Sequence, residues 1–351
     1  MCFKRCFLSR SAYNELLVVG SRWRRFLAKP SPQDLDSSST NPKLVTSQVT
    51  IIPTLHIASI KFYDQVLDYL RIAVQRNKNT VIFLEGICDS CEAQQAQMRE
   101  YHEIVQNKSL QEAIVLKANQ NNLYTENTMR DICEELSVDY DTLLRYTNEV
   151  RLQECYLKPK IAAYCGLNLC NTVDLDMGKV QALLQDEAIR LSTLGESLPS
   201  SVSVTEIGSF PVIRKNRERR VAQLARMQCK QWYQDGIESE VIIPWGYFHS
   251  EAIIHNIIEG NADPIDQDST NQVDVSVSRG SSTSEPGKIE SNLDENTSGT
   301  ASNLSRSKKS TPVSASPDKP TLVFVEADEL VAKVPFGLPK DLVEIKTDTN
   351  S

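Results

Sequence analysis

The hydrophobic residues of this 351-residue chain fall into short β-branched runs and longer segments of helical periodicity. Three runs, at 49–53, 80–85 and 241–244, are mostly apolar and short enough for strands. Such runs are typical of strands buried on both faces of a sheet. Segments with helical spacing follow them, at 59–77, 92–107, 109–195, 214–234 and 250–259. This order predicts an α/β fold, in which helices flank a central mixed sheet.

The segments outside the predicted α/β domain, 46–260, follow other patterns. Residues 31–45 are rich in Pro, Ser and Asp, which predicts a linker and a folded part that begins near Val45. Residues 261–320 are dense in Ser, Thr, Asn, Asp and Gly, and burial of so few apolar side chains cannot offset the entropy of ordering. We therefore expect a disordered insertion there. Two short β-branched runs within 321–345 predict a hairpin that returns to the domain.

Residues 1–30 form a basic leader, with seven Lys or Arg and one acidic residue, Glu15. An Arg-rich, Ser-containing and acid-poor leader resembles a mitochondrial transit peptide. The same composition also suits an ordinary N-terminal extension. We therefore expect a mitochondrial location, with a cytoplasmic one as the alternative. No run of about 18 apolar residues occurs in the chain, so we expect no transmembrane segment.

The overall charge limits the possible partners. A formal net charge of −8 is opposite to what contacts with nucleic-acid phosphates require, so we expect no nucleic-acid partner. Nine scattered cysteines indicate free thiols in a reducing compartment. Cys88 and Cys91 form a C-x-x-C motif, but no second pair accompanies it, and we assign it no function.

Two of the four histidines occupy matching places in the sequence. Val49-Thr-Ile-Ile-Pro-Thr-Leu-His56 and Val241-Ile-Ile-Pro-Trp-Gly-Tyr-Phe-His249 are both a β-branched run, a turn residue and then a histidine. Glu85 ends the third run, where a lone carboxylate is costly unless it is paired or bound to a metal. Because ligands of α/β sheets gather at the carboxyl ends of the strands, these three side chains predict one site.

Two imidazoles and a carboxylate are a ligand set for zinc, manganese, iron or cobalt, and a metal held there lowers the pKa of a bound water. Without a metal, a His beside a Glu can act as a general base. Arg217, in a basic run at 214–220, is the candidate to hold Glu85 or a substrate carboxylate. The alternative is structural: each His caps a helix and Glu85 pairs with an Arg. Asp174 and Asp176 are expected to cap the helix that follows them.

These motifs, in this order, resemble the TraB/Tiki-like family, which is related to the erythromycin esterases and the haem-binding ChaN proteins. The family pattern is G-x-x-H after the first strand, an acidic residue ending the next strand, an Arg-bearing helix and a second G-x-x-H. Glu85, Arg217 and Gly246-Tyr-Phe-His249 fit the last three positions. The first motif departs from the pattern, because Pro53 in Pro53-Thr-Leu-His56 stands where the family has Gly, and proline fixes φ.

The resemblance implies two related β-α units whose His-bearing turns meet at one end. It also implies a metal-dependent hydrolase of peptidase or esterase type with a peptide or small-molecule substrate. Such an enzyme would use His56, Glu85 and His249 with Mn, Zn, Co or Fe, and Arg217 beside them. The ChaN-like relatives imply the alternative of a protein that binds haem or a metal without turnover. Because of Pro53, a scaffold without chemistry is a further alternative.

Overall fold

The computed structural model of the chain describes the following residues: 20–31, 45–120, 129–130, 132–133, 138–170, 173–198, 207–208, 210–260 and 322–339. The predicted insertion at 261–320 lies outside these residues. So do residues 1–19 and most of the predicted linker, at 32–44.

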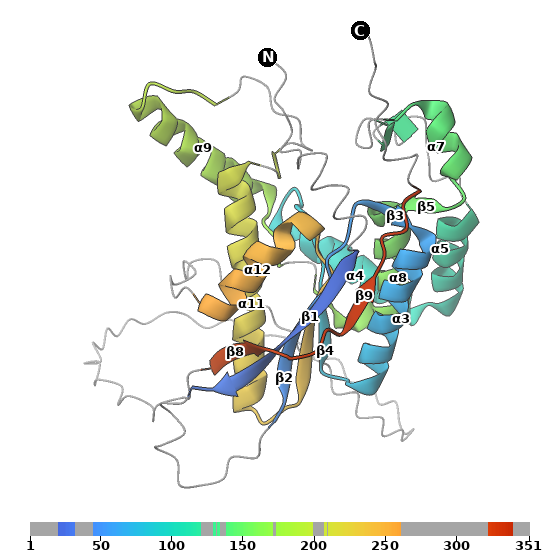
Figure 1. Cartoon of the computed structure of the whole chain (residues 1–351), viewed down its shortest axis with the longest axis horizontal. Helices are drawn as coiled ribbons and strands as arrows, with labels where there is room; N and C mark the ends of the chain where they lie inside the picture. Colours follow the sequence, from blue (N-terminus) through green and yellow to red (C-terminus); the bar gives the residue numbers. More distant parts are fainter. Residues whose placement is uncertain are drawn as a thin grey trace, which may run out of the picture. The chain divides into compact units, whose positions relative to one another are not determined.

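The core of the described unit is a mixed sheet (Figure 1). Seven of the described strands form it, in the order β6-β4-β7-β2-β1-β8, with β9 also paired to β1. They are β1 Ser21–Pro30, β2 Ser47–Ile51, β4 Thr80–Phe83, β6 Leu169–Cys170, β7 Ser239–Ile243, β8 Leu322–Glu326 and β9 Ala332–Val334. β6, β4, β7 and β2 are parallel, whereas β1 is antiparallel to β2, β8 and β9. The predicted α/β class with a mixed sheet and flanking helices is confirmed.

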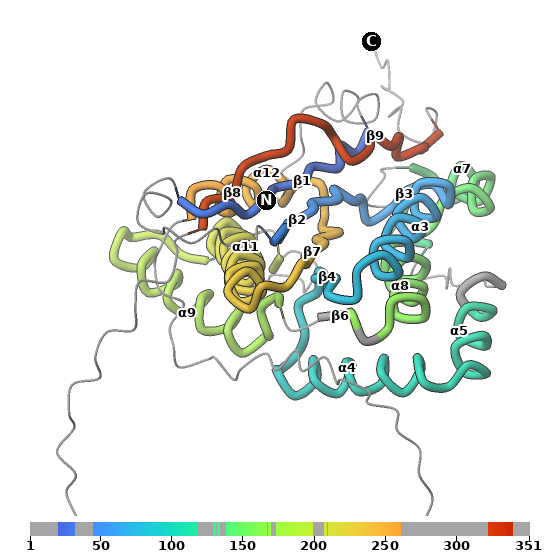
Figure 2. Tube along the Cα trace, turned by 90° about the horizontal axis from the view of Figure 1, so that it is seen from below, coloured from blue at the N-terminus to red at the C-terminus, as the bar shows by residue number. Residues whose placement is uncertain are grey.

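Helices cover both faces of the sheet (Figure 2). α3 (Ile60–Arg76) and α8 (Lys158–Cys165) pack on one face, and α11 (Pro211–Gln234) and α12 (Tyr247–Glu259) pack on the other. Successive strand residues point to opposite faces, so Ile242 contacts the first layer and its neighbour Val241 the second. The apolar residues 81–83 of β4 and 241–243 of β7 are therefore buried on both faces of the sheet, as their hydrophobic runs predict.

Smaller elements surround these layers. The short strands β3 (Ile57–Ser59) and β5 (Val150–Leu152) form a separate antiparallel pair. The other described helices are α4 Cys91–Gln106, α5 Lys108–Gln120, α7 Tyr140–Tyr146, the π-helix η1 Gln153–Leu157, the 3-10 helix η2 Gly166–Asn168 and α9 Met177–Thr193. α3 begins where the sequence predicts, because Ser59 caps it and accepts a hydrogen bond from the Phe62 amide at 3.1 Å.

The prediction that residues 1–30 form a leader outside the fold is wrong for 21–30. These residues are β1, an inner strand whose Phe26 pairs with Val49 of β2 and is fully buried. The basic composition hides the strand, because its arginines have acidic partners on other elements. Arg24 binds Glu326 of β8 at 2.6 Å and Glu251 of α12 at 3.1 Å. The folded part therefore begins well before Val45.

The C-terminal segment does return to the sheet, but not as a hairpin. β8 pairs with residues 26–30 of β1, and β9 pairs with residues 21–23 of the same strand. Between them, Ala327 and Val331 donate backbone hydrogen bonds to Arg25 and Trp23 of β1, at 2.8 and 2.9 Å. β1 is ten residues long, enough to pair with both runs along one edge. The two runs therefore pair with β1 and not with each other.

None of the helices in the described part of the chain is long and apolar enough to cross a membrane.

Removal of the Phe336 side chain should weaken the fold. Phe336 follows β9, is fully buried and packs on Phe62, with ring centroids 5.0 Å apart. Phe336→Ala should lower the free energy of unfolding by about 3–5 kcal/mol, because it leaves a cavity in the core. Val325→Ala, at a 43% exposed position of β8, is the control and should change it by less than about 0.5 kcal/mol. Urea denaturation measures both values, and equal small losses would refute the docking of this segment.

Candidate functional site

The predicted site lies at the carboxyl ends of three neighbouring parallel strands. β2, β7 and β4 are in register, since Val241 pairs with Val49 on one side and with Val81 on the other. The pairing continues past the strands: Thr54 bridges to Gly246, and the Thr54 amide donates to the Trp245 carbonyl at 2.8 Å. The two His-bearing turns are therefore neighbours.

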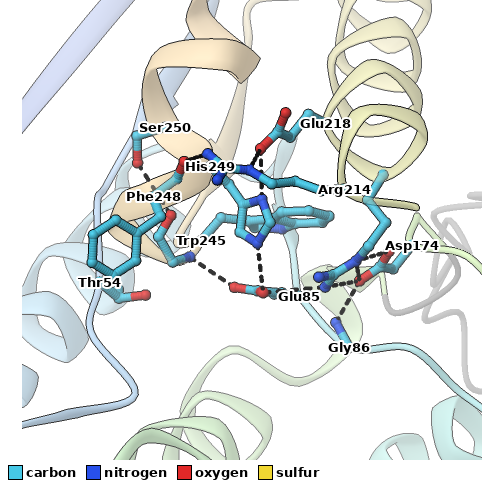
Figure 3. A network of polar contacts seen from close by, with 12 residues as sticks. Thr54, Glu85, Gly86, Asp174, Arg214, Glu218, Trp245, Phe248, His249 and Ser250 are labelled. Atoms are coloured by element: carbon cyan, nitrogen blue, oxygen red, sulfur yellow. Dashed lines mark hydrogen bonds and ion pairs between the residues drawn. The ribbon is translucent and has the colours of Figure 1, made fainter. Parts of the chain in front are cut away.

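Glu85 follows β4 and is buried at the centre of a polar network (Figure 3). Its Oε2 accepts a hydrogen bond from the Gly246 amide at 2.7 Å, and its Oε1 accepts one from Arg217 Nη2 at 3.1 Å. His249 Nε2 lies 3.6 Å from the same Oε1. Burial raises the pKa of Glu85, but the charges of Arg217, His249, His56 and Lys158 lower it to about 2. This carboxyl group is therefore ionised at neutral pH.

Arg217 of α11 is buried and binds two carboxylates. Its Nε and Nη2 donate to Asp174 Oδ1 and Oδ2 at 2.9 and 2.7 Å, a bidentate pair, while Nη2 also reaches Glu85. Asp174 is almost fully buried and also accepts a hydrogen bond from the Gly86 amide at 2.9 Å. Burial opposes the charge of Arg217, but Asp174 and Glu85 outweigh it and raise the pKa of Arg217 above its ordinary value. The predicted contact of Arg217 with Glu85 is present.

His249 lies between two carboxylates. It is in the first turn of α12, and its Nδ1 is 2.8 Å from Glu218 Oε1. Arg214, one turn earlier on α11, donates to the same Glu218 oxygen at 2.7 Å. When Nδ1 carries the proton and donates to Glu218, Nε2 presents its lone pair toward Glu85. The ring side chain is 12% exposed, so Nε2 and Glu85 Oε1 face each other in a nearly dry site.

His56, the other predicted ligand, is positioned by hydrogen bonds to its backbone. Its backbone carbonyl accepts hydrogen bonds from the Gln153 amide at 2.7 Å and from Tyr63 Oη at 3.1 Å. Its side chain belongs to an exposed residue at the same edge of the sheet, near enough for its charge to act on Glu85. The turn before it is anchored through Pro53, whose carbonyl accepts a hydrogen bond from Ser21 of β1 at 2.5 Å.

The structure thus brings Glu85, Arg217 and His249 into contact and leaves His56 at the rim. Within the described residues, no three His, Cys, Asp or Glu side chains gather closely enough to hold a metal ion. The donor set fits a metal in part. His249 Nε2 and Glu85 Oε1 are 3.6 Å apart, a separation open to two ligands whose bonds are each about 2.1 Å long. However, Glu85 Oε1 already accepts a hydrogen bond from Arg217, and this contact competes with metal binding.

Two residues of the network are missing from the sequence-based site. Glu218 directly follows Arg217 and lies four residues after Arg214, so the i,i+4 spacing of opposite charges was a usable signal. Asp174 is not the helix cap that the sequence predicts. Asp176 alone takes that role, accepting from the Lys179 amide at 2.9 Å, while Asp174 turns inward to Arg217. No local pattern distinguishes these two aspartates.

A cavity of about 350 Å³ adjoins Glu85 and Gly86. Residues of α4, α5 and α8 line it, together with the segments that precede α4 and α8. Its polar lining beyond Glu85 consists of Gln97, Glu100, Tyr101, Glu154 and Lys158. A volume of this size suits a small ligand or one residue of a peptide.

No protein-family model, curated protein or solved structure matches the chain. The function therefore has to be argued from the site.

Replacement of Glu85 by Gln should reduce the dependence of stability on pH. In the folded protein the pKa of Glu85 is lowered from 4.5 to about 2, so its ionised form stabilises the fold above pH 4.5. That contribution is lost as the pH falls from about 4.5 to about 2, and E85Q lacks it. The free energy of unfolding across this window, measured by urea denaturation, should fall more steeply for the wild type than for E85Q.

The control is Glu187→Gln, which removes a surface carboxylate that pairs with Arg190 at 2.6 Å. Solvent screens such a pair, so E187Q should follow the wild-type curve closely. Identical acid dependence of the wild type and E85Q would show that Glu85 is not held as an ion pair.

Proposed function

We propose that this chain is a hydrolase of peptidase or esterase type, in which Glu85 and His249 activate a water molecule. The observation that carries the proposal is the line of three groups Glu218–His249–Glu85. Glu218 lies 2.8 Å from one ring nitrogen of His249, and Glu85 lies 3.6 Å from the other. A carboxylate that orients an imidazole and leaves its second nitrogen free to accept a proton is the arrangement of a general base in acyl transfer.

His249 is the base in this proposal. Glu218 fixes the tautomer, because an Nδ1 proton directed at its carboxylate leaves Nε2 free to accept a proton from water. Arg214 in turn holds Glu218, so the ring is fixed from α11 while it is carried by α12. When Nε2 takes the proton, the two flanking carboxylates stabilise the imidazolium that forms.

Glu85 is the second group that contacts the water molecule in this proposal. Arg217 and the Gly246 amide hold both of its oxygens, so the carboxylate is ionised and fixed before any substrate arrives. Preorganised charges of this kind require no rearrangement during the reaction. Arg217 is a positioning residue here, since Asp174 and Glu85 occupy its donors.

In an alternative version of the proposal, His249 Nε2 would bind a divalent metal, of which Mn, Zn, Co and Fe are the candidates, instead of acting as the base. Glu85 and His249 would hold it, with His56 from the adjacent turn as the third ligand. Such an ion supplies Lewis acidity, which lowers the pKa of water and polarises a carbonyl. The resemblance to the TraB/Tiki-like family supports this version, whereas the engagement of Glu85 by Arg217 supports hydrolysis by the His and Glu side chains alone.

The proposal predicts that activity depends on His249 and Glu218. On a panel of p-nitrophenyl esters and aminoacyl p-nitroanilides, His249→Ala should lower kcat by about 10²- to 10⁴-fold, because it removes the base. Glu218→Gln should lower it by about 10- to 100-fold, because the ring loses its orientation. His255→Ala is the matched control. His255 is on the same helix, 62% exposed and paired with Glu259 at 2.9 Å, so H255A should act like the wild type.

Elemental analysis of the same proteins decides the role of metal. Stoichiometric metal in the wild type and its loss in H249A and E85Q would support ligation, and its loss in His56→Ala would make His56 the third ligand. A wild type that binds metal or haem without turnover would favour the capture alternative. Turnover that H249A retains in full would refute the hydrolase.

A further inference from the structure

We infer that Lys158 is the group that binds the carbonyl oxygen of the substrate and stabilises the negative charge that develops on it. The inference rests on the proposed hydrolase. It adds the electrophilic half of the site, which the line of Glu218, His249 and Glu85 does not contain. Hydrolysis of an ester or amide needs a donor at this oxygen as well as a base on the water.

The position of Lys158 points to this role. It is the first residue of α8, directly after the π-helix Gln153–Leu157, and it lines the cavity beside Glu85. π-helical turns are rare and frequent at functional sites. The ammonium group lies over Gly86, with Nζ 3.6 Å from the place that a Cβ on that glycine would take. Lys158 and Glu85 thus line the same cavity as Gly86, and the ammonium lies close to the backbone that follows Glu85.

Other cations near the site are already in use. Arg217 is buried and binds Asp174 and Glu85, and Arg214 binds Glu218. Of the described residues that line the cavity, Lys158 alone is a cation. Its side chain is only 13% exposed, so its charge is partly shielded from solvent and acts more strongly on a ligand inside the cavity.

Lys158 also has a partner that a substrate can replace. Its Nζ contacts Glu154 Oε1 at 2.5 Å, four residues earlier in the chain, and the Glu154 side chain is 57% exposed. Because the Glu154 end of the pair is open to solvent, water can take the place of the ammonium on that carboxylate when a substrate oxygen binds Lys158. An ammonium has three donors, and one of them can turn to the ligand while another stays on Glu154.

With Lys158 in this role, the hydrolysis needs no reactant besides water and the substrate. Water gives a proton to His249 Nε2 and forms a C–O bond to the carbonyl carbon. The π pair moves onto the carbonyl oxygen, which accepts a hydrogen bond from Lys158. When this intermediate collapses, the bond to the leaving alkoxide or amine breaks, and the leaving group takes the proton from His249. The products are the carboxylic acid and the alcohol or amine.

The test compares Lys158→Ala with Glu154→Gln, since both remove the same salt bridge from opposite sides. Under the inference, K158A lowers kcat by about 10²- to 10³-fold with little change in KM, because the donor acts in the transition state. Added ethylammonium should restore part of that kcat, as the small amine fills the vacated space. E154Q should lower kcat far less than K158A does, because it leaves the ammonium group in place. Equal effects of the two variants would show that Lys158 serves only the salt bridge.

A binding measurement separates this inference from the proposed function. Phenylphosphonate mimics the tetrahedral intermediate, and calorimetry should show that K158A binds it at least about 10-fold more weakly than H249A does. If H249A is inactive while K158A turns over and binds phenylphosphonate like the wild type, only the role of Lys158 fails. If H249A keeps full activity, the hydrolase proposal fails and the role of Lys158 fails with it.

Discussion

The buried charge of Arg217 is the constraint on which the rest of the site depends. A guanidinium without solvent must have carboxylate partners, and Asp174 and Glu85 come from two other parts of the chain. The same carboxylates accept hydrogen bonds from the backbone amides of Gly86 and Gly246. One cation therefore fixes α11, the end of β4, the segment before α9 and the turn after β7 relative to one another. Loss of Arg217 would leave two carboxylates in the interior without their cation.

The sheet is the second feature that fixes the positions of the site residues. The in-register strands β2, β7 and β4 end together, and the Trp245 indole donates to the Phe83 carbonyl at 3.0 Å across that edge. Only a short segment connects β7 to His249 in the first turn of α12, so the register of the strands positions His249 next to Glu85. Glu85 lines the cavity next to α8 and also lies 3.6 Å from His249, so the carboxylate borders both the base and the space for a ligand.

Long-range pairing marks the limit of what the sequence could predict. The buried strands, the helices beside them and the meeting of Glu85 with His249 follow from apolar runs and from the rule that strand ends share an edge, although the same rule also predicted His56, which lies at the rim. The partnership of Asp174 with Arg217 does not follow, because residues 43 positions apart meet only through tertiary packing. β1 was hidden for a related reason: its arginines look like a solvated leader until their acidic partners on β8 and α12 are known. The two C-terminal runs resemble a hairpin because no local signal reveals that a single long strand pairs with both.

The pairing of β1 with β8 also bears on how this chain reaches its native state during translation. Arg24 and Glu326 are 302 residues apart, so the outer edge of β1 leaves the ribosome long before the strand that covers it. In the meantime that edge presents unpaired amides and carbonyls, together with the apolar side chains of Trp23 and Phe26 on its two faces, to the surrounding solution. Contacts between residues so far apart in the sequence form slowly, and intermediates with exposed strand edges aggregate readily. A chaperone that shields β1 until synthesis ends would therefore raise the yield of folded protein.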